Sequence, residues 1–407
     1  MLVIGGGAAG MMCAVTAARM GVKVTVLERN EKIGRKLYIT GKGRCNVTNC
    51  TDGEEFNRNL VTNARFLYSA LSRFNSYDTM DFFESAGVEL KVERGNRVFP
   101  VSDKSADIID ALWREAQAAG VRLVLSCRVQ TLTFADGKFV ADTDKGMFED
   151  NRVVIATGGV TYPATGSTGD GYSFAKAFGH TVVPPVGALV GLRCAGTSAY
   201  AGLTLKNVRV SVERCGKEIC TEFGEMLYTH TGVSGPTVLT ISSKINRLAP
   251  DGLTLVVDLK PAVEWETLDQ RLLETLSANN KQLVNAVRDY LPNALVEGWI
   301  KNASVDARKP ANSVTKEERA RLAKALKRFV YPIEGLEPIE GAVATAGGVS
   351  VKEVDPKTME SKLQKGLYFA GEVLDVDALT GGFNLQIAFA TGYTAAFFAA
   401  KKENEND

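Results

Sequence analysis

The chain has 407 residues, of which 45% are hydrophobic and 23% are charged, and its formal net charge is +1. This length exceeds the roughly 250–300 residues at which a single hydrophobic core stops growing, so two or three domains are expected. The balanced charge argues against binding of the nucleic-acid backbone, which needs a basic stripe, so no nucleic-acid partner is expected.

The first thirty residues predict a β-α-β unit. Leu2–Ile4 is a short apolar strand, Ala9–Met20 is an alanine-rich helix without proline, and Val22–Leu27 is a β-branched strand. Continuous apolar strands of this kind are typical of parallel sheets that are buried on both faces. Residues 29–50 then form a polar, glycine-rich loop that is too long for a simple connection, so a functional role is expected for it.

Three helices, two buried strands and an antiparallel meander are predicted next, at Phe56–Ser72, Tyr77–Ser85, Lys104–Ala119, Val121–Leu125, 128–149 and Arg152–Ala156. Residues 186–258 hold short alternating runs, which predict an antiparallel sheet or barrel. Residues 262–330 carry leucines at helical spacing between prolines. Continuous apolar segments like those of the N-terminal part then return, and they predict a buried strand at Leu367–Ala370 and a helix at Asn384–Ala399.

The simplest architecture is a single α/β domain, formed by residues 1–186 and 339–407, that an inserted region interrupts. Within the insert, residues 187–260 are predicted to form a β-barrel-like domain and residues 261–338 a helical domain. In this arrangement the strand near residue 367 rejoins the sheet that the first strand begins. A parallel sheet needs its central strands covered on both faces, so the helices Ala9–Met20 and Asn384–Ala399 must pack near that shared core.

The seven cysteines and two histidines predict neither a disulfide framework nor a metal site, because no Cys/His cluster has zinc-ligand spacing. Met1–Ala18 and Ala378–Ala400 are uncharged stretches. However, glycines interrupt the first, while the second begins with a turn and contains Gln386. We therefore expect a cytoplasmic protein with neither a secretory signal nor a membrane span.

The strongest motif is the glycine-rich sequence GGGAAG at residues 5–10, since it follows a strand and opens a helix. Gly5 makes the tight turn, Gly7 lets the backbone approach a pyrophosphate, and Gly10 lets helix and strand pack closely. The helix N-terminus offers free N–H groups to the phosphates. Glu28 ends the next strand and can accept hydrogen bonds from ribose hydroxyls. A glycine-rich turn without a ligand is the less favoured interpretation.

Two further glycine sites favour FAD over NAD, because three separate cofactor-facing sites fit a long molecule such as FAD better. Thr157 and Gly158 follow one buried strand, and Gly371 and Glu372 follow another. A glycine there permits close approach of the backbone to a ligand, and the glutamate can reach a ribityl or ribose hydroxyl. The helix that begins near Asn384 would aim its positive end at the negative charge that reduced flavin carries at N1 and O2.

The segment Gly34–Asn49, GRKLYITGKGRCNVTN, resembles the signature of the bacterial YhiN/BaiN-like flavoproteins, a group that includes enzymes described as aminoacetone oxidases and bile-acid-pathway reductases. Further matches at 231–236, 346–349, 358–362 and 366–392 extend the resemblance over nearly the whole chain. It implies a two-dinucleotide-type FAD domain that carries an inserted barrel and a helical region. Carried over motif by motif, it implies FAD contacts at Ala9, Glu28, Arg29, Arg35, Lys36, Gly41, Val129, Asn384 and Leu385.

The complete set of predicted cofactor-binding residues is Gly5, Gly7, Ala8, Ala9, Gly10, Glu28, Arg29, Arg35, Lys36, Gly41, Val129, Thr157, Gly158, Gly371, Glu372, Asn384 and Leu385. Lys36 is expected either to neutralise phosphates or to hold its loop. Arg44, Cys45 and Asn46 are candidates to line the flavin, with the thiol packed rather than redox-active. The predicted binding of FAD is noncovalent, and no catalytic residue is assigned.

The sequence thus predicts an FAD-dependent oxidoreductase that transfers a hydride to or from the flavin and acts on a small molecule of unknown identity. An O₂-using oxidase and an NAD(P)H-dependent reductase both remain open. NAD(P)H would bind transiently, because no second G-x-G-x-x-G motif follows. The alternative is a protein in which FAD has a structural role, in a binding or nucleic-acid-modifying module. The sequence does not determine the oligomeric state.

Overall fold

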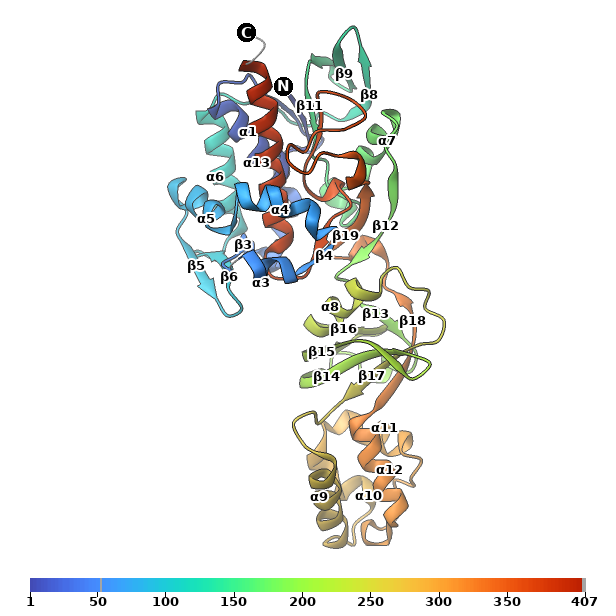
Figure 1. Cartoon of the computed structure of the whole chain (residues 1–407). Helices are drawn as coiled ribbons and strands as arrows, with labels where there is room; N and C mark the ends of the chain where they lie inside the picture. The colour runs from blue at the N-terminus through green and yellow to red at the C-terminus, as the bar shows by residue number, and fades with distance from the viewer. Residues whose placement is uncertain (52, 405–407) are drawn as a thin grey trace. The chain divides into compact units, whose positions relative to one another are not determined.

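The computed structural model describes residues 1–51 and 53–404, and its contacts divide the chain into two compact units (Figure 1). Unit 1 comprises residues 1–188 and 338–407, and unit 2 comprises residues 189–337. The predicted boundaries, at 186/187 and 338/339, stand within two residues of these positions. The last residues of the predicted first domain, 405–407, lie outside the described residues.

Unit 1 is built on a five-stranded sheet of order β20-β11-β1-β2-β7. These strands are β1 (Leu2–Ile4), β2 (Thr25–Leu27), β7 (Arg122–Val124), β11 (Val153–Ile155) and β20 (Leu367–Phe369). Every neighbouring pair in it is parallel. The predicted pairing of the C-terminal strand with the N-terminal sheet is confirmed, since Leu367 lies opposite Val153.

Helices α1 (Ala8–Arg19) and α13 (Phe383–Asn404) lie side by side next to this sheet (Figure 1). Their backbones approach closely at Gly392, where a Cβ atom would stand 2.3 Å from the carbonyl oxygen of Ala9. The other helices of unit 1 are α2 (Arg35–Ile39), α3 (Gly53–Arg58), α4 (Ala64–Arg73), α5 (Ser76–Ser85), α6 (Ser105–Ala118) and α7 (Asp170–Ala177). None of the described helices is both long enough and apolar enough to cross a membrane.

Small antiparallel sheets complete unit 1. The meander predicted at 128–149 is confirmed as β8 (Val129–Ala135), β9 (Lys138–Thr143) and β10 (Gly146–Asp150). Three others were not predicted. They are the three-stranded sheet of β3 (Thr48–Asn49), β6 (Arg97–Pro100) and β5 (Leu90–Glu93), the pair of β4 (Leu60–Thr62) with β21 (Asp377–Ala378), and the pair of β12 (Val182–Ala188) with β19 (Ala344–Val349). The single helix predicted at Phe56–Ser72 is wrong. Strand β4 interrupts it and separates α3 from α4, because β4 pairs with β21, a strand over three hundred residues away.

Unit 2 contains a closed barrel of order β13-β16-β15-β14-β17-β18. Its strands are β13 (Leu192–Cys194), β14 (Thr204–Arg214), β15 (Lys217–Tyr228), β16 (Gly232–Ser234), β17 (Leu253–Asp258) and β18 (Phe329–Leu336). Its helices are α8 (Pro236–Ile245), α9 (Trp265–Ser277), α10 (Leu283–Ala286), α11 (Asn293–Asn302) and α12 (Lys316–Lys327).

The structure differs from the predicted separation of a helical domain at 261–338 from a barrel at 187–260. The end of the predicted helical segment is β18, which pairs with both β13 and β17. Barrel and helices also share one core, in which Leu255 of β17 belongs to the same cluster as Leu272 of α9 and Trp299 of α11. The helices between β17 and β18 therefore bury their leucines against the barrel.

Candidate cofactor site

The turn between β1 and α1 has the geometry that the glycine motif predicts. Gly5 has a φ angle of +107°, and a Cβ there would stand 2.5 Å from the carbonyl oxygen of Ala156, so the turn requires glycine. A Cβ at Gly10 would stand 1.9 Å from the carbonyl oxygen of Gly5, so this glycine lets helix and strand pack. Gly7 is different, because no described atom lies within 4 Å of a Cβ built there. The N-terminus of α1 therefore faces open space.

Glu28 follows β2 and its carboxylate faces the same turn. Its Oε2 accepts a hydrogen bond from the backbone N–H of Gly6 at 2.6 Å, and its Oε1 accepts one from the N–H of Asn30 at 2.7 Å. These bonds fix a side chain that is only 6% exposed. Oε1 also accepts a hydrogen bond from Asn30 Nδ2 at 2.7 Å. Oε2 keeps a second acceptor position, so it could receive a ribose hydroxyl of a dinucleotide.

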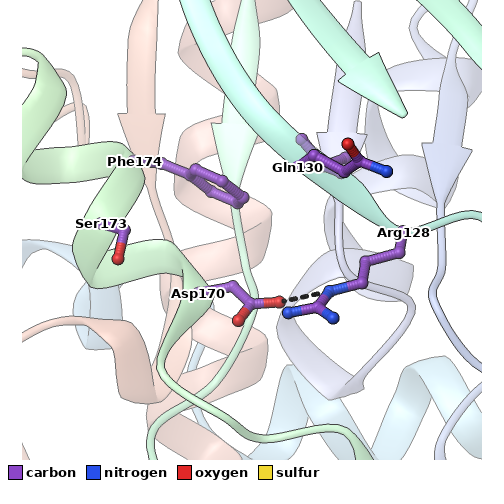
Figure 2. Close-up of a pocket in the computed structure, with 6 residues that line it drawn as sticks. Arg128, Gln130, Asp170, Ser173 and Phe174 are labelled. Atoms are coloured by element: carbon purple, nitrogen blue, oxygen red, sulfur yellow. Dashed lines mark ion pairs between the residues drawn. The ribbon is translucent and has the colours of Figure 1, made fainter. Parts of the chain in front are cut away.

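A pocket of about 390 Å³ opens between β8 and α7, and it is lined by Arg128, Val129, Gln130, Asp170, Ser173 and Phe174. Figure 2 shows the carboxylate of Asp170 pointing toward Arg128, whose Nε is 3.6 Å from Asp170 Oδ2. The same oxygen accepts a hydrogen bond from Arg29 Nη1 at 3.0 Å. Because Arg29 is next to Glu28 in the sequence, these ion pairs place the pocket near Glu28. Two predicted residues, Arg29 and Val129, thus meet here.

Two other predicted residues, Lys36 and Glu372, bind each other. Lys36 Nζ is 2.7 Å from Glu372 Oε2 and donates to Thr161 Oγ1 at 2.6 Å. The other carboxylate oxygen, Oε1, accepts a hydrogen bond from the N–H of Thr345 at 2.7 Å. These contacts join α2 to β19 and to the 3-10 turn at Gly371–Val373. These contacts are consistent with the loop-holding role predicted for Lys36. The phosphate role of Lys36 and the reach of Glu372 to a ribityl hydroxyl stay predictions.

Arg44 anchors the signature loop through contacts with three other side chains. Its guanidinium lies 4.0 Å from the ring centroid of Phe99 and donates to Glu93 Oε1 at 2.9 Å and Asp103 Oδ1 at 3.1 Å. The hydrogen bond to Glu93 raises the pKa of Arg44, so the side chain stays charged. The loop is thereby fastened to the β5–β6 hairpin, which the sequence did not predict.

The two residues after Arg44 differ in accessibility and in hydrogen bonding. Cys45 is fully buried, and this burial raises the pKa of its thiol to about 12, so it is the packed, protonated thiol that was expected. Asn46 Oδ1 is buried without a hydrogen-bond partner among the described residues, and so is Oγ1 of the predicted Thr157. Buried polar atoms are normally paired, so both atoms fit contacts to a bound ligand.

The start of α13 is held by hydrogen bonds that the sequence did not predict. Gln386 Oε1 accepts hydrogen bonds from the hydroxyls of Thr48 and Thr79, each at 2.7 Å. The side chain of Asn384 is used locally, since its Oδ1 accepts from the N–H of Ala378 at 3.0 Å. Pairs that are more than three hundred positions apart, such as Gln386 and Thr48, leave no local signal in a sequence.

The remaining predicted residues are distributed around these elements. Arg35 is exposed and donates to Asn30 Oδ1 at 3.1 Å. Gly371 has a φ angle of +77°, and a Cβ there would stand 2.8 Å from the Cβ of Ala9. The others are exposed Gly41 on the signature loop, half-buried Ala8 in the first turn of α1, Gly158 after β11, and half-buried Leu385 in α13.

The Lys36–Glu372 pair gives a direct test. Lys36→Met should lower the free energy of unfolding by about 1–2 kcal/mol, because it leaves a half-buried carboxylate without its cation. Adding Glu372→Gln should restore part of that loss, as measured by denaturant unfolding of all four proteins of the cycle. If Lys36→Met instead leaves stability unchanged and weakens FAD binding equally in both backgrounds, Lys36 serves the phosphates.

Comparison with known proteins identifies the family. A family model described as the HI0933-like protein Rossmann domain matches residues 1–398. A protein named 3-dehydro-bile acid delta(4,6)-reductase, from Clostridium scindens, is 33% identical over 98% of this chain and 98% of its own length. Two proteins named ribosomal RNA dihydrouridine synthase, from Haemophilus influenzae and Escherichia coli, are 31% and 32% identical over 98% and 97% of this chain and 98% and 96% of their own.

A solved structure of a mutated FrdA from Escherichia coli quinol fumarate reductase has the same fold. The two superpose with a TM-score of 0.52 over 100% of this chain and 70% of the other, at 16% sequence identity. Together with the parallel sheet and the glycine turn, the match to the family model settles the membership. The chain belongs to the HI0933-like family and is an FAD-dependent oxidoreductase with a Rossmann-type α/β fold.

Proposed function

We propose that the protein reduces a carbon–carbon double bond that is conjugated to a carbonyl group of a small molecule. The observation that carries this proposal is the pair of names among the full-length relatives. A delta(4,6)-reductase of a 3-dehydro bile acid acts on double bonds conjugated to a 3-oxo group. Dihydrouridine formation saturates the C5=C6 bond of uridine, which is conjugated to the C4 carbonyl. One reaction type, delivery of a hydride to such a bond, covers both substrates.

We propose that FAD binds at the carboxyl ends of β1, β11 and β20. The open N-terminus of α1 at Gly7 suits a pyrophosphate. Glu28 would orient the ribose, and the pocket at Val129 has room for the adenine. Asn46 and Thr157 would pair their buried oxygens with the bound group. When bound, FAD supplies the hydride chemistry, while the chain binds and orients it without a covalent bond.

The proposal predicts that NADPH or NADH reduces the flavin and that a conjugated enone reoxidises it. The purified yellow protein is mixed with either nicotinamide under argon, and the loss of visible flavin absorption is recorded. Addition of a 3-oxo-Δ4 steroid should restore the absorption and yield a product that is two mass units heavier than the steroid. If neither nicotinamide bleaches the flavin and the chemically reduced protein is not reoxidised by the enone, the structural-FAD alternative replaces this proposal.

A second candidate substrate is a uridine within RNA, which the two synthase relatives favour. The same reduced protein is incubated with deproteinised ribosomal RNA. The RNA is then digested to nucleosides, whose masses are measured by mass spectrometry. Uridine that gains two mass units identifies RNA as the substrate, whereas activity confined to the free enone identifies a small molecule. The net charge of +1 supports the small molecule.

We also propose that the protein works in the cytoplasm. Its seven cysteines are free thiols, and free thiols are typical of proteins from a reducing compartment.

A further inference from the structure

The antiparallel ribbon of β12 and β19 lies close in sequence to both crossings of the chain between the two units. β12 ends at Ala188, the last residue before unit 2 begins, and β19 follows the return of the chain at Pro338. The pairing runs from Ala188 opposite Ala344 at one end to Val182 opposite Val349 at the other. We call the end at Val182 and Val349 the root of the ribbon.

His180 lies two residues before the root and is held between two side chains. Its Nε2 is 2.7 Å from Ser361 Oγ, and its Nδ1 lies 3.3 Å from Glu353 Oε2 without the geometry of a hydrogen bond. Glu353 also accepts hydrogen bonds from the N–H and the hydroxyl of Thr181, both at 2.8 Å. His180 is 3% exposed and Ser361 is 7% exposed. The segment that follows β19 is thus fastened to the segment that precedes β12.

The hydrogen bonds of Ser361 fix the protonation state of the ring. Ser361 Oγ accepts from the N–H groups of Leu363 at 3.0 Å and Gln364 at 2.9 Å. A hydroxyl has two acceptor positions and one proton, so this proton must point to His180 Nε2. The ring is then neutral, with its own proton on Nδ1 facing Glu353. A protonated ring would direct a second N–H at an oxygen that has no free acceptor position.

The sequence of contacts Ser361, His180 and Glu353 is also that of a hydrolase triad. Here, however, the hydroxyl oxygen is buried and is already used by two backbone N–H groups. A nucleophile must reach its substrate, so this cluster has a conformational role and not a hydrolytic one.

We propose that the Ser361–His180–Glu353 cluster is an acid-sensitive latch that holds the root of the β12–β19 ribbon at neutral pH and releases it on acidification. Glu353 is the charged group that faces the ring. The other contacts of His180 among the described residues are uncharged: the Phe369 ring of β20, with its centroid 4.8 Å away, and the Ala175 carbonyl of α7, which accepts from the backbone N–H of His180.

The direction of the pH effect follows from the two states of the latch. Burial lowers the pKa of His180 in the closed form, and Glu353 opposes this only in part. In the open form the ring returns toward its ordinary pKa of about 6.5. The open form therefore binds a proton more readily, so the closed form loses stability as the pH falls below that value, and the loss ends below the lowered pKa.

Hydrogen exchange of the holoprotein at pH 7.5 and 5.5, corrected for intrinsic exchange rates, tests the latch. Protection at Val182, Val183 and Val349 should fall by as much as about tenfold per pH unit relative to the central sheet. His180→Gln should remove this pH dependence, whereas His230→Gln, at the exposed second histidine, should keep it. Equal pH dependence in the wild type and His180→Gln overturns the proposal.

If His180→Gln does not fold, titration of the native His180 ring provides a second test. In the His230→Gln protein His180 is the one remaining histidine, and its ring proton signals can be followed by NMR from pH 8 to 5. The latch requires titration below the ordinary value of about 6.5. Titration at or above that value in the folded protein would overturn it.

Discussion

Gly7→Val is expected to give a folded protein that contains no flavin. The backbone at Gly7 has a φ angle of −83°, which any residue adopts, and no described atom lies within 4 Å of a Cβ there. The chain itself therefore tolerates valine. The branched side chain would instead fill the space in front of α1 where a pyrophosphate must contact the backbone. Flavin absorption per mole of protein, together with the circular dichroism and melting temperature, separates loss of cofactor from loss of fold.

Gly341→Val is the matched control. Gly341 is exposed, lies outside the left-handed region and has no described atom within 4 Å of a Cβ, but it does not face a helix N-terminus that could bind phosphate. This variant should keep its full complement of flavin. A Gly7→Val protein that is folded and retains stoichiometric FAD would remove the glycine turn from the cofactor site.

The elements that the sequence predicted well are those whose neighbours are close along the chain. The turn at Gly5–Gly10, the first helix and the meander at 128–149 each rest on local spacing, turn chemistry and periodicity. The strand at Leu367–Ala370 is the one distant element placed correctly in the sheet. Its continuous apolar run fits the buried position next to β11.

The missed elements depend on partners that are far away in sequence. β12 contains Pro184 and Pro185, and proline normally argues against a paired strand. These prolines sit at a register shift between Val183 and Val186, which removes the need for their N–H groups. The same reason applies within the candidate site. The pairing of Lys36 with Glu372 joins residues 336 positions apart, so two residues predicted separately as FAD contacts were found to bind each other.

Gly392→Val is expected to destabilise unit 1 by at least about 3 kcal/mol, the upper end of the usual cost of overpacking. A Cβ at this position would stand 2.3 Å from the carbonyl oxygen of Ala9 and 3.2 Å from its Cα. These are backbone atoms, so no side-chain rotation relieves the contact and α1 must move away from α13. Ala9 lies next to Gly10, whose own contact with Gly5 allows no compensating shift. The displacement therefore reaches the turn that carries the cofactor motif.

In Gly392→Val, the free energy of unfolding from denaturant titration and the flavin content per mole of protein should both fall when they are measured on the same preparations. Gly392→Ala should show a smaller change of the same sign, since it adds the first offending atom but not the two methyl groups beyond it. Valine has a higher helix propensity than glycine, so propensity alone would stabilise Gly392→Val and cannot explain a loss. Ala118→Val, at an exposed position of α6, shows the cost of valine in a helix without a backbone contact, and this cost should be no more than about 0.7 kcal/mol. If Gly392→Val unfolds at the wild-type denaturant concentration with its flavin intact, then α1 and α13 do not pack as closely as described. Loss of stability with full retention of flavin would instead show that the turn at Gly5–Gly10 holds its geometry independently of the packing between these two helices.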